Sequence, residues 1–281
     1  MKAINALVDP AWLQAHADDP QVKLVEIAGT GQAQMQAYKA GHVPGATCWQ
    51  WKDLLWDTHI RDFSAPEELA RRLGGAGIDN DSTVVFYGEG VQFGFYAWWV
   101  LTYCGHDRVA VLDGGRSNWV ARGLPLTTAM PPAPKPVNYR PVTRNEGMRI
   151  GRDAVREALG KPDGLILDGR SAEEYRGERV NSPQFQDFGA LRYGRIPGAQ
   201  HLYFEDLFDS DKRLKSPEAL KALVEARAAT AGKNIITYCR MSHRATVLYF
   251  VLSRMLGCPS VRVYDGSWTE WGNLVGFPVE R

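Results

Sequence analysis

The chain repeats its own sequence at the scale of a whole domain. The segment Gly41–Ala46 reads GHVPGA, and Gly194–Ala199 reads GRIPGA. The copies lie about 150 residues apart, well beyond the roughly 20–50 residues of a solenoid repeat. Two similar domains are therefore expected. Three more matched pairs occur in the same order: Thr83–Leu101 with Asn234–Leu252, Val109–Trp119 with Val261–Trp271, and Gly123–Pro125 with Gly276–Pro278.

A proline-rich stretch separates the two copies. Between residues 124 and 142, prolines stand at positions 125, 131, 132, 134, 136 and 141. Proline has no backbone N–H group, so such a stretch fits neither a helix interior nor a central strand and is typical of a semi-rigid linker. We predict a first domain at 1–125, a linker at 126–144 and a second domain at 145–281.

Short apolar runs alternate with helical patterns in both copies. Such runs are typical of strands that are buried on both faces, and the alternation predicts an α/β fold with a mostly parallel sheet flanked by helices in each domain. In a sheet of this kind, ligands bind beyond the carboxyl ends of the strands. The predicted strands are Val22–Ile27, Thr83–Tyr87, Val109–Leu112, Leu165–Leu167, Asn234–Tyr238 and Val261–Val263.

The predicted helices begin at recognisable signals. Ser64 is a candidate cap for a helix at Pro66–Leu73, and Ser216 is the candidate cap for one at Pro217–Ala228, with proline at the first helical position. The other predicted helices are Phe95–Tyr103, Ala245–Leu256 and Ser267–Trp271.

Composition excludes several classes of function. The 281 residues carry a formal net charge of +1, which argues against general binding to nucleic acid or to an anionic membrane. The N-terminal sequence has no secretory signal pattern and no apolar run reaches membrane-spanning length, so we expect a cytoplasmic protein. The four cysteines form no C-x-x-C pair, so neither a metal site nor a disulfide framework is expected.

One cysteine stands at the end of a predicted strand. Cys239 directly follows Tyr238, and Arg240, His243 and Arg244 come within the next five residues. The thiolate is the nucleophilic form of cysteine, and loop N–H groups, a following helix N-terminus and nearby cations all favour it. Structural burial is the common alternative for a free cysteine. Three cations beside an apolar strand weigh against it, so Cys239 is the predicted nucleophile.

The first copy provides an internal control. Tyr87 matches Tyr238, so Gly88 stands where the second copy has Cys239, and the loop GEGVQF at 88–93 has neither thiol nor basic residue. We expect only the second domain to be catalytic, with the first supplying a wall of the active-site cleft, because pockets favour domain interfaces. We interpret the other cysteines as structural: Cys48, Cys104 and Cys258.

These motifs resemble those of the tandem-domain rhodaneses, a family of sulfurtransferases. The resemblance covers essentially the whole chain and rests on the duplicated GHVPGA and GRIPGA, LDGR at 167–170, YCRMSHRA at 238–245 and YDGSWTEWG at 264–272. It implies two rhodanese-like domains, of which only the C-terminal one is catalytic. It also implies a six-residue active-site loop that starts at Cys239 and binds substrate through Arg240, Met241, Ser242, His243 and Arg244.

Other residues are expected to support that loop. Asp168 and Arg170 are interpreted as a structural ion pair beneath it, and Asp265 and Trp268 as further support. No carboxylate is placed to orient His243, so we expect it to face an anion instead of acting as a general base.

Loop length and charge distinguish among related activities. Phosphatases with a related fold use C-x5-R, which would place the arginine at position 245, where this chain has alanine. The mercaptopyruvate branch usually has a small, neutral C-G-S-G-V-T loop and an arginine where this chain has Glu174. A charged loop favours a dianionic donor such as thiosulfate. Four arginines of the second-domain insertion are alternative contacts for the donor: Arg176, Arg179, Arg192 and Arg195.

The predicted reaction is a double displacement that needs no cofactor. Cys239 takes the outer sulfur of thiosulfate as a persulfide, and cyanide or a thiol then removes it. The alternatives are a 3-mercaptopyruvate sulfurtransferase, a persulfide carrier that serves one thiol protein, and a catalytically inactive scaffold.

Overall fold

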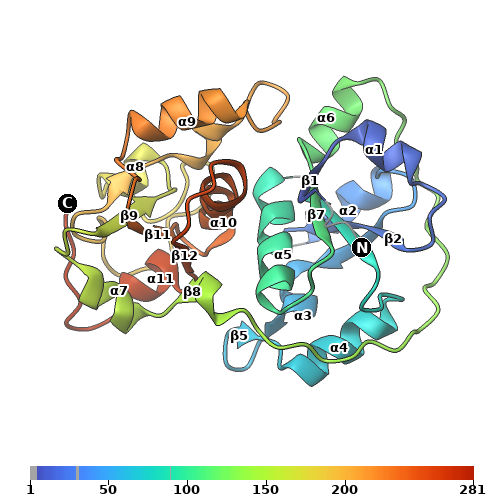
Figure 1. The fold of residues 1–281 in the computed structure, drawn as a ribbon, viewed down its shortest axis with the longest axis horizontal. Coiled ribbons are helices and arrows are strands. Elements are labelled where there is room, and N and C mark those ends of the chain that lie inside the picture. Colours follow the sequence, from blue (N-terminus) through green and yellow to red (C-terminus); the bar gives the residue numbers. More distant parts are fainter. Residues whose placement is uncertain (1–4, 30–31, 89) are drawn as a thin grey trace. The chain divides into compact units, whose positions relative to one another are not determined.

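The computed structural model describes residues 5–29, 32–88 and 90–281, and the chain divides into two compact units (Figure 1). The first unit comprises residues up to Asn145 together with Ser210–Leu214, and the second comprises Glu146–Asp209 and Lys215–Arg281. Each unit contains a five-stranded parallel sheet with helices on both sides. The predicted α/β fold with two tandem domains is thus confirmed.

The first sheet has the strand order β1-β7-β6-β2-β3, and a short antiparallel pair, β4–β5, lies outside it. All six residues of the central strand β6 are buried, as its apolar sequence predicts. The elements of the first unit are β1 Leu7–Val8, α1 Pro10–Ala15, β2 Val22–Ala28, α2 Gln32–Ala40, β3 Thr47–Gln50, α3 Trp51–Leu55, β4 Trp56–Asp57, β5 Asp62–Phe63, α4 Pro66–Gly75, β6 Thr83–Gly88, α5 Val91–Tyr103, β7 Val109–Leu112 and α6 Gly115–Ala121.

The second sheet repeats this topology. Its order, β8-β12-β11-β9-β10, places β11 at the centre, as β6 is in the first sheet. The elements of the second unit are η1 Glu146–Met148, β8 Arg149–Ile150, α7 Arg152–Ala158, β9 Gly164–Asp168, α8 Ala172–Tyr175, β10 Gln200–His201, η2 Phe204–Leu207, α9 Pro217–Glu225, β11 Asn234–Tyr238, α10 His243–Phe250, η3 Val251–Met255, β12 Val261–Tyr264 and α11 Ser267–Trp271.

The duplication extends to individual hydrogen bonds. The indole N–H of Trp119 donates to the carbonyl oxygen of Pro125 at 2.9 Å, and that of Trp271 donates to Pro278 at 2.7 Å. The Tyr87 hydroxyl donates to Glu26 at 2.6 Å, just as the Tyr238 hydroxyl donates to Asp168 at 2.5 Å. The sequence match therefore reflects two copies of one hydrogen-bonding scheme.

Most predicted strands and helices lie where the sequence placed them. The strand at Val109–Leu112 and the helix at Ser267–Trp271 have the predicted bounds. Ser216 caps α9 by accepting a hydrogen bond from the N–H of Ala219. The cap prediction for Ser64 is wrong: Ala65 is the cap residue of α4 and has no side chain that could accept such a bond.

The segment between the copies has neither helix nor strand, as its prolines predict, and it packs along the first unit. The N–H of Val137 donates to the carbonyl oxygen of Gly74 at 2.9 Å. Tyr139 is buried and its hydroxyl lies 3.0 Å from Nδ1 of His106. The segment is therefore held by specific contacts over much of its length.

Candidate active site

Cys239 is the first residue after the central strand of the second sheet. Its side chain is buried, with the residue 1% exposed. Its N–H donates to the hydroxyl oxygen of Ser267 at 3.2 Å, and its carbonyl oxygen accepts from the N–H of Trp268 at 2.9 Å. Both backbone groups of the cysteine are thus fixed by the segment that follows β12.

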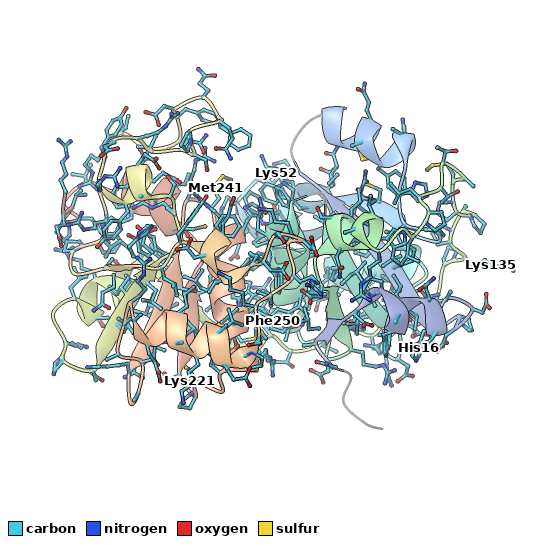
Figure 2. All side chains as sticks on the ribbon, turned by 90° about the horizontal axis from the view of Figure 1, so that it is seen from above. His16, Lys52, Lys135, Lys221, Met241 and Phe250 are labelled. Atoms are coloured by element: carbon cyan, nitrogen blue, oxygen red, sulfur yellow. The ribbon has the colours of Figure 1, made fainter. Side chains whose placement is uncertain are left out.

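The loop from Cys239 to Arg244 turns sharply before α10 begins. Ser242 has a left-handed backbone, with φ of 71°, which is strained for a residue with a side chain. Its hydroxyl oxygen lies 2.6 Å from both the carbonyl oxygen and Oδ1 of Asp265, so this contact holds the strained residue in place. Figure 2 labels Met241 in the loop and Phe250 at the end of the helix that follows.

The loop presents backbone donors without a protein acceptor. The N–H groups of Arg240, Met241 and Ser242 donate to none of the residues that the structure describes. Helix α10 starts at the next residue, and its first N–H group, that of His243, already donates to the carbonyl oxygen of Met241 at 3.0 Å. An anion at the carboxyl end of β11 would therefore meet a cluster of free donors and the positive end of a helix dipole.

The two arginines of the loop have different surroundings. Arg244 forms a buried, two-pronged ion pair with Glu174, with N–O distances of 2.6 and 2.8 Å. Burial lowers the pKa of Arg244, but the bonds and charge of Glu174 outweigh this effect, so the pKa is raised. Most of the positive charge of Arg244 is therefore neutralised within the protein.

Arg240 forms no hydrogen bond with a carboxylate in the described part of the chain. Its guanidinium donates to the carbonyl oxygen of Phe188 at 3.2 Å and to the Met241 sulfur at 3.3 Å, and it lies over the Phe188 ring at 5.0 Å. Its Nε is buried without a hydrogen-bond partner among the described residues. Burial and then the charge of Arg244 lower the pKa of Arg240. Arg240 is thus the loop cation that an incoming anion would stabilise most.

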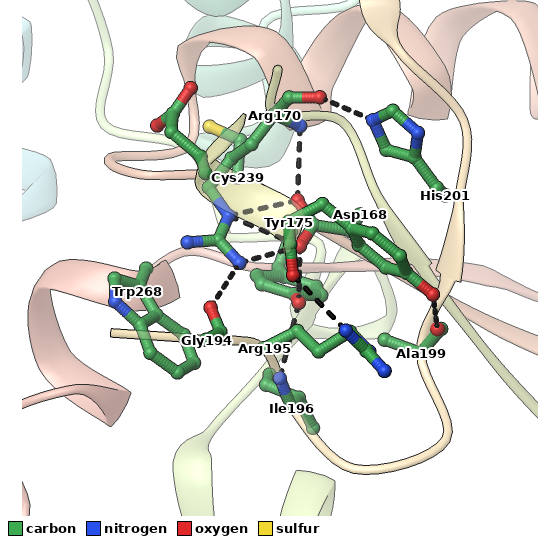
Figure 3. Close-up of polar contacts among 12 residues, drawn as sticks. Asp168, Arg170, Tyr175, Gly194, Arg195, Ile196, Ala199, His201, Cys239 and Trp268 are labelled. Atoms are coloured by element: carbon green, nitrogen blue, oxygen red, sulfur yellow. Dashed lines mark hydrogen bonds and ion pairs between the residues drawn. The ribbon is translucent and has the colours of Figure 1, made fainter. Parts of the chain in front are cut away.

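A second buried ion pair lies beneath the loop (Figure 3). Asp168 and Arg170 are fully buried and share three side-chain contacts of 2.7–3.1 Å. The Tyr238 hydroxyl donates to Asp168, and the Arg170 guanidinium also donates to the carbonyl oxygen of Gly194 at 2.8 Å. Since Tyr238 directly precedes Cys239, this network fixes the end of the strand that carries the cysteine.

The charges in this network stabilise one another. Burial raises the pKa of the Asp168 carboxyl, but Arg170 and the Tyr238 hydroxyl outweigh it, and the pKa lies below its ordinary value. Burial, with the charge of Asp168, raises the pKa of Tyr238 well above normal, so this hydroxyl keeps its proton and remains a donor. The Arg170 guanidinium also lies 4.6 Å over the ring of Trp268. Asp168 and Arg170 thus contact Tyr238, the residue before Cys239, whereas Asp265 and Trp268 contact the loop itself.

Two contributors were not singled out from the sequence, Ser267 and the hydroxyl of Tyr238, and Glu174 was noted only for the arginine it replaces. Ser267 is buried with φ of 53°, a strained value for serine, and its hydroxyl oxygen accepts from Cys239. The signal was in the repeat, because Ser267 matches Gly115, which has φ of 52°. A side chain where the matched copy has glycine indicates a constraint beyond the turn itself.

The corresponding position of the first unit has no room for a side chain. A Cβ atom on Gly88 would lie 2.9 Å from the carbonyl oxygen of Ile27, 3.0 Å from that of Gly90 and 3.0 Å from Cβ of Phe93. The first contact is shorter than real Cβ atoms essentially ever show, and the other two are tighter than nine in ten real Cβ contacts. Residue 89, which belongs to the same loop, lies outside the described residues.

The four arginines predicted as alternative donor contacts, of which Arg195 lies just beyond the insertion at 176–193, make no hydrogen bond to the loop among the described residues. Arg176 pairs with Glu178, and Arg195 pairs with Glu280. Arg179 and Arg192 donate to backbone carbonyl oxygens, Arg192 to four of them.

The remaining cysteines are free. Burial raises the pKa of Cys48 to about 12, and Glu26 adds to the shift, so this thiol stays protonated. Within the described ranges, no cluster of three His, Cys, Asp or Glu side chains is arranged to hold a metal ion. No helix in those ranges is both long and apolar enough to cross a membrane.

Comparison with known proteins gives this site a context. The chain is 42% identical over 281 residues to the "Sulfur carrier protein TtuD" of Thermus thermophilus, covering 99% of this chain and 97% of that protein. It is 37% identical over 286 residues to a protein of Haloferax volcanii named "Putative thiosulfate sulfurtransferase", covering 99% and 97%.

Solved structures support the fold. The structure of wild-type EanB superposes with a TM-score of 0.85 at 24% identity, covering 98% of this chain and 69% of that one.

The model of the Rhodanese-like domain matches twice, at residues 9–122 and 152–274. Each match contains its sheet except for one edge strand, β1 in the first unit and β8 in the second, and the second match contains Cys239 and its loop. The chain belongs to the rhodanese family, with two rhodanese-like domains in tandem.

Proposed function

We propose that this protein is a thiosulfate sulfurtransferase that carries sulfur on Cys239 as a persulfide. The observation that carries the proposal is the six-residue loop around this cysteine. It combines a buried thiol at the end of the central strand with three N–H groups and one cation, Arg240. Among the described residues, these N–H groups have no acceptor and Arg240 has no carboxylate hydrogen-bond partner. A negatively charged sulfur species is the kind of group that such surroundings stabilise.

The first half-reaction transfers the outer sulfur of thiosulfate. The Cys239 thiolate attacks that sulfur, a new S–S bond forms, and the original S–S bond breaks with its electron pair leaving on sulfite. Arg240 stabilises the departing negative charge, while the loop N–H groups stabilise the persulfide anion. The Glu174 pair leaves Arg244 mainly a positioning role at the start of α10.

The second half-reaction removes the sulfur. A thiophilic acceptor, cyanide or a thiolate, attacks the outer sulfur of the persulfide and regenerates the Cys239 thiolate. Sulfur leaves as thiocyanate or as the acceptor's persulfide, so electrons balance without an added oxidant. No metal or organic cofactor enters this scheme.

Steady-state kinetics test the two-step scheme. With thiosulfate and cyanide varied together, a double displacement gives parallel double-reciprocal lines, and Cys239→Ala abolishes turnover. Lines that intersect would point to direct transfer within a ternary complex and overturn the persulfide route. Replacing thiosulfate by 3-mercaptopyruvate tests the donor. We expect the larger kcat/KM for thiosulfate, because a charged loop suits a dianion.

A second candidate function is that of a persulfide carrier serving a thiol protein. The relative named a sulfur carrier, which matches the whole chain, favours it. In that case, Cys239 still forms a persulfide, but turnover with cyanide is far slower than transfer to the thiol protein. The two candidates share the first half-reaction and differ only in the acceptor.

A further inference from the structure

The second unit has an insertion that the first unit lacks. Two residues separate Tyr38 from Gly41, whereas eighteen, 176–193, separate the matching Tyr175 from Gly194. The insertion contains no helix or strand. A long loop present only in the copy that carries the cysteine calls for an explanation beyond the fold.

Specific contacts hold this loop at both ends. The Asp187 carboxylate accepts from the N–H groups of Val180 and Asn181 and from the Tyr193 hydroxyl, at 2.8, 3.2 and 3.0 Å. Arg192 donates to the carbonyl oxygens of four residues between Trp271 and Phe277 at 2.6–3.1 Å. The loop is therefore built into the unit.

The loop exposes large apolar side chains. Phe185 is 60% exposed, Phe188 58% and Leu191 84%. In the described part of the second unit, only one other large apolar side chain, Val275, is exposed in this way. These three residues lie within seven positions of one loop, and exposed apolar side chains that gather on one segment mark interaction surfaces. We call these three residues the insertion patch.

The insertion patch adjoins the residue next to Cys239. The Arg240 guanidinium donates to the carbonyl oxygen of Phe188 and lies over its ring. A Cβ atom on Gly189 would come within 2.8 Å of the same guanidinium, which shows how closely the loop approaches Arg240. Since Cys239 itself is only 1% exposed, an acceptor that reaches it must pass over its neighbours.

The charge around the insertion patch is positive. The hydrogen bonds of Arg179, Arg192 and Arg240 with described residues go to carbonyl oxygens and a thioether, and none goes to a carboxylate. Only Asp187 and Glu178 carry negative charge on the insertion itself, and Glu178 is paired with Arg176. A complementary partner would combine apolar side chains with carboxylates.

We propose that the insertion patch docks a protein thiol acceptor, one whose cysteine is flanked by apolar and acidic residues. This inference rests on the proposed persulfide chemistry and names its partner class. The acceptor thiolate attacks the outer sulfur of the Cys239 persulfide. The bond between that sulfur and Cys239 breaks, its electron pair returns to Cys239, and the acceptor carries the sulfur away as its own persulfide.

The test compares two synthetic peptides as acceptors for the sulfur-loaded protein. In one, a single cysteine stands between leucines and glutamates; in the other, lysines replace the glutamates. The rate of transfer is followed by the gain of one sulfur atom in the mass of each peptide. We expect wild-type protein to react roughly tenfold faster with the acidic peptide. The double variant Phe185→Ser/Leu191→Ser should transfer sulfur to that peptide roughly tenfold more slowly than wild type, while its turnover with cyanide stays unchanged.

Controls separate the possible failures. Val120→Ser removes an apolar side chain that is 52% exposed in the first unit and should change neither reaction. Equal rates for wild type and the double variant with the acidic peptide would overturn the docking proposal. So would a wild-type dimer in sedimentation that the double variant lacks, because the patch would then bind a second copy. Absence of any persulfide would instead defeat the proposed function.

Discussion

At the scale of single residues, the site separates two arginines that the sequence could not distinguish. Arg240 and Arg244 both belong to the loop, and both were expected to bind the donor. Of the two, only Arg244 pairs with a buried carboxylate, that of Glu174. The sequence could not show this pair, because Glu174 lies on a short helix far from the loop along the chain. That helix begins with a capping box in which the Glu174 carboxylate also accepts from the N–H of Ser171. One carboxylate thus links a helix start to the active-site loop.

Substituting each arginine by glutamine should give opposite results. Arg244→Gln leaves the buried Glu174 without its cation and should lower the free energy of unfolding by about 3–5 kcal/mol. Arg240→Gln breaks no ion pair and should lower the free energy of unfolding by less than about 1 kcal/mol. It should lower kcat/KM for thiosulfate by roughly 10- to 100-fold, since a charge-assisted bond to the donor is lost. Urea unfolding and initial rates measure the two effects. Equal losses of unfolding free energy in the two variants would contradict the different roles assigned to Arg240 and Arg244.

Ser267 offers a test of how the cysteine backbone is held. Ser267→Gly removes the hydroxyl that accepts from the N–H of Cys239 and relieves the left-handed backbone strain. The variant should therefore be at least as stable as wild type, while kcat/KM falls by roughly tenfold. Ser267→Ala loses the same bond but keeps the strain, so it should be the less stable of the two. Wild-type rates in Ser267→Gly would show that this hydrogen bond is dispensable.

At the scale of elements, the strands were predicted best and the connecting segments worst. The runs ending at Tyr87 and Tyr238 are buried on both faces, so their sequences alone marked them as central strands. The strand Leu7–Val8 was missed because two residues at a sheet edge carry no pattern. Ser64 was wrongly taken as a cap, since serine near a helix start is only a frequent cap. The insertion was noticed for its arginines, whereas its exposed apolar residues became evident only from burial.

The segment between the copies should contribute a pH-dependent stability. Burial lowers the pKa of His106, whose ring contacts the Tyr139 hydroxyl and the carbonyl oxygen of Ser82. The unfolded chain therefore binds this proton more readily. The resulting stability is fully present above about pH 6.5 and is lost as the pH falls below that value toward the lowered pKa. Urea unfolding at pH 7.5 and 5.5 should show a larger loss for wild type than for His106→Gln. An equal loss would assign the dependence to other groups.

At the scale of the whole molecule, one fold is used twice and only one copy carries the thiol. The matched strand orders, tryptophan bonds and tyrosine–carboxylate bonds show that the scaffolds remained alike. The repeat predicted this duplication and the Gly88–Cys239 contrast from the sequence alone. It could not reveal the tight surroundings of Gly88, because these depend on atoms of Ile27, Gly90 and Phe93 that come together only in the folded chain. The resemblance supplied the candidate site residues and the expected Asp168–Arg170 pair, whereas the partners of Arg244 and of the Cys239 N–H group became evident only from the structure.

The loop of the first unit should not accept a transplanted cysteine. Gly88→Cys places a Cβ atom about 3 Å from two carbonyl oxygens and should lower the unfolding free energy by roughly 1–3 kcal/mol. In a Gly88→Cys/Cys239→Ser double variant, incubation with thiosulfate should add no sulfur. A persulfide on residue 88 in that variant would mean that the scaffold alone suffices and that the loop of the second unit is not needed.

The intact mass of the protein after incubation with thiosulfate shows directly whether Cys239 carries sulfur. We expect a gain of one sulfur atom in wild type, its removal by cyanide, and no gain in Cys239→Ser. Circular dichroism of the variant would confirm that the fold is intact. No gain with thiosulfate but a gain with 3-mercaptopyruvate would mean that 3-mercaptopyruvate is the sulfur donor. No gain with either donor, or an equal gain in Cys239→Ser, would contradict the central claim that Cys239 carries the sulfur.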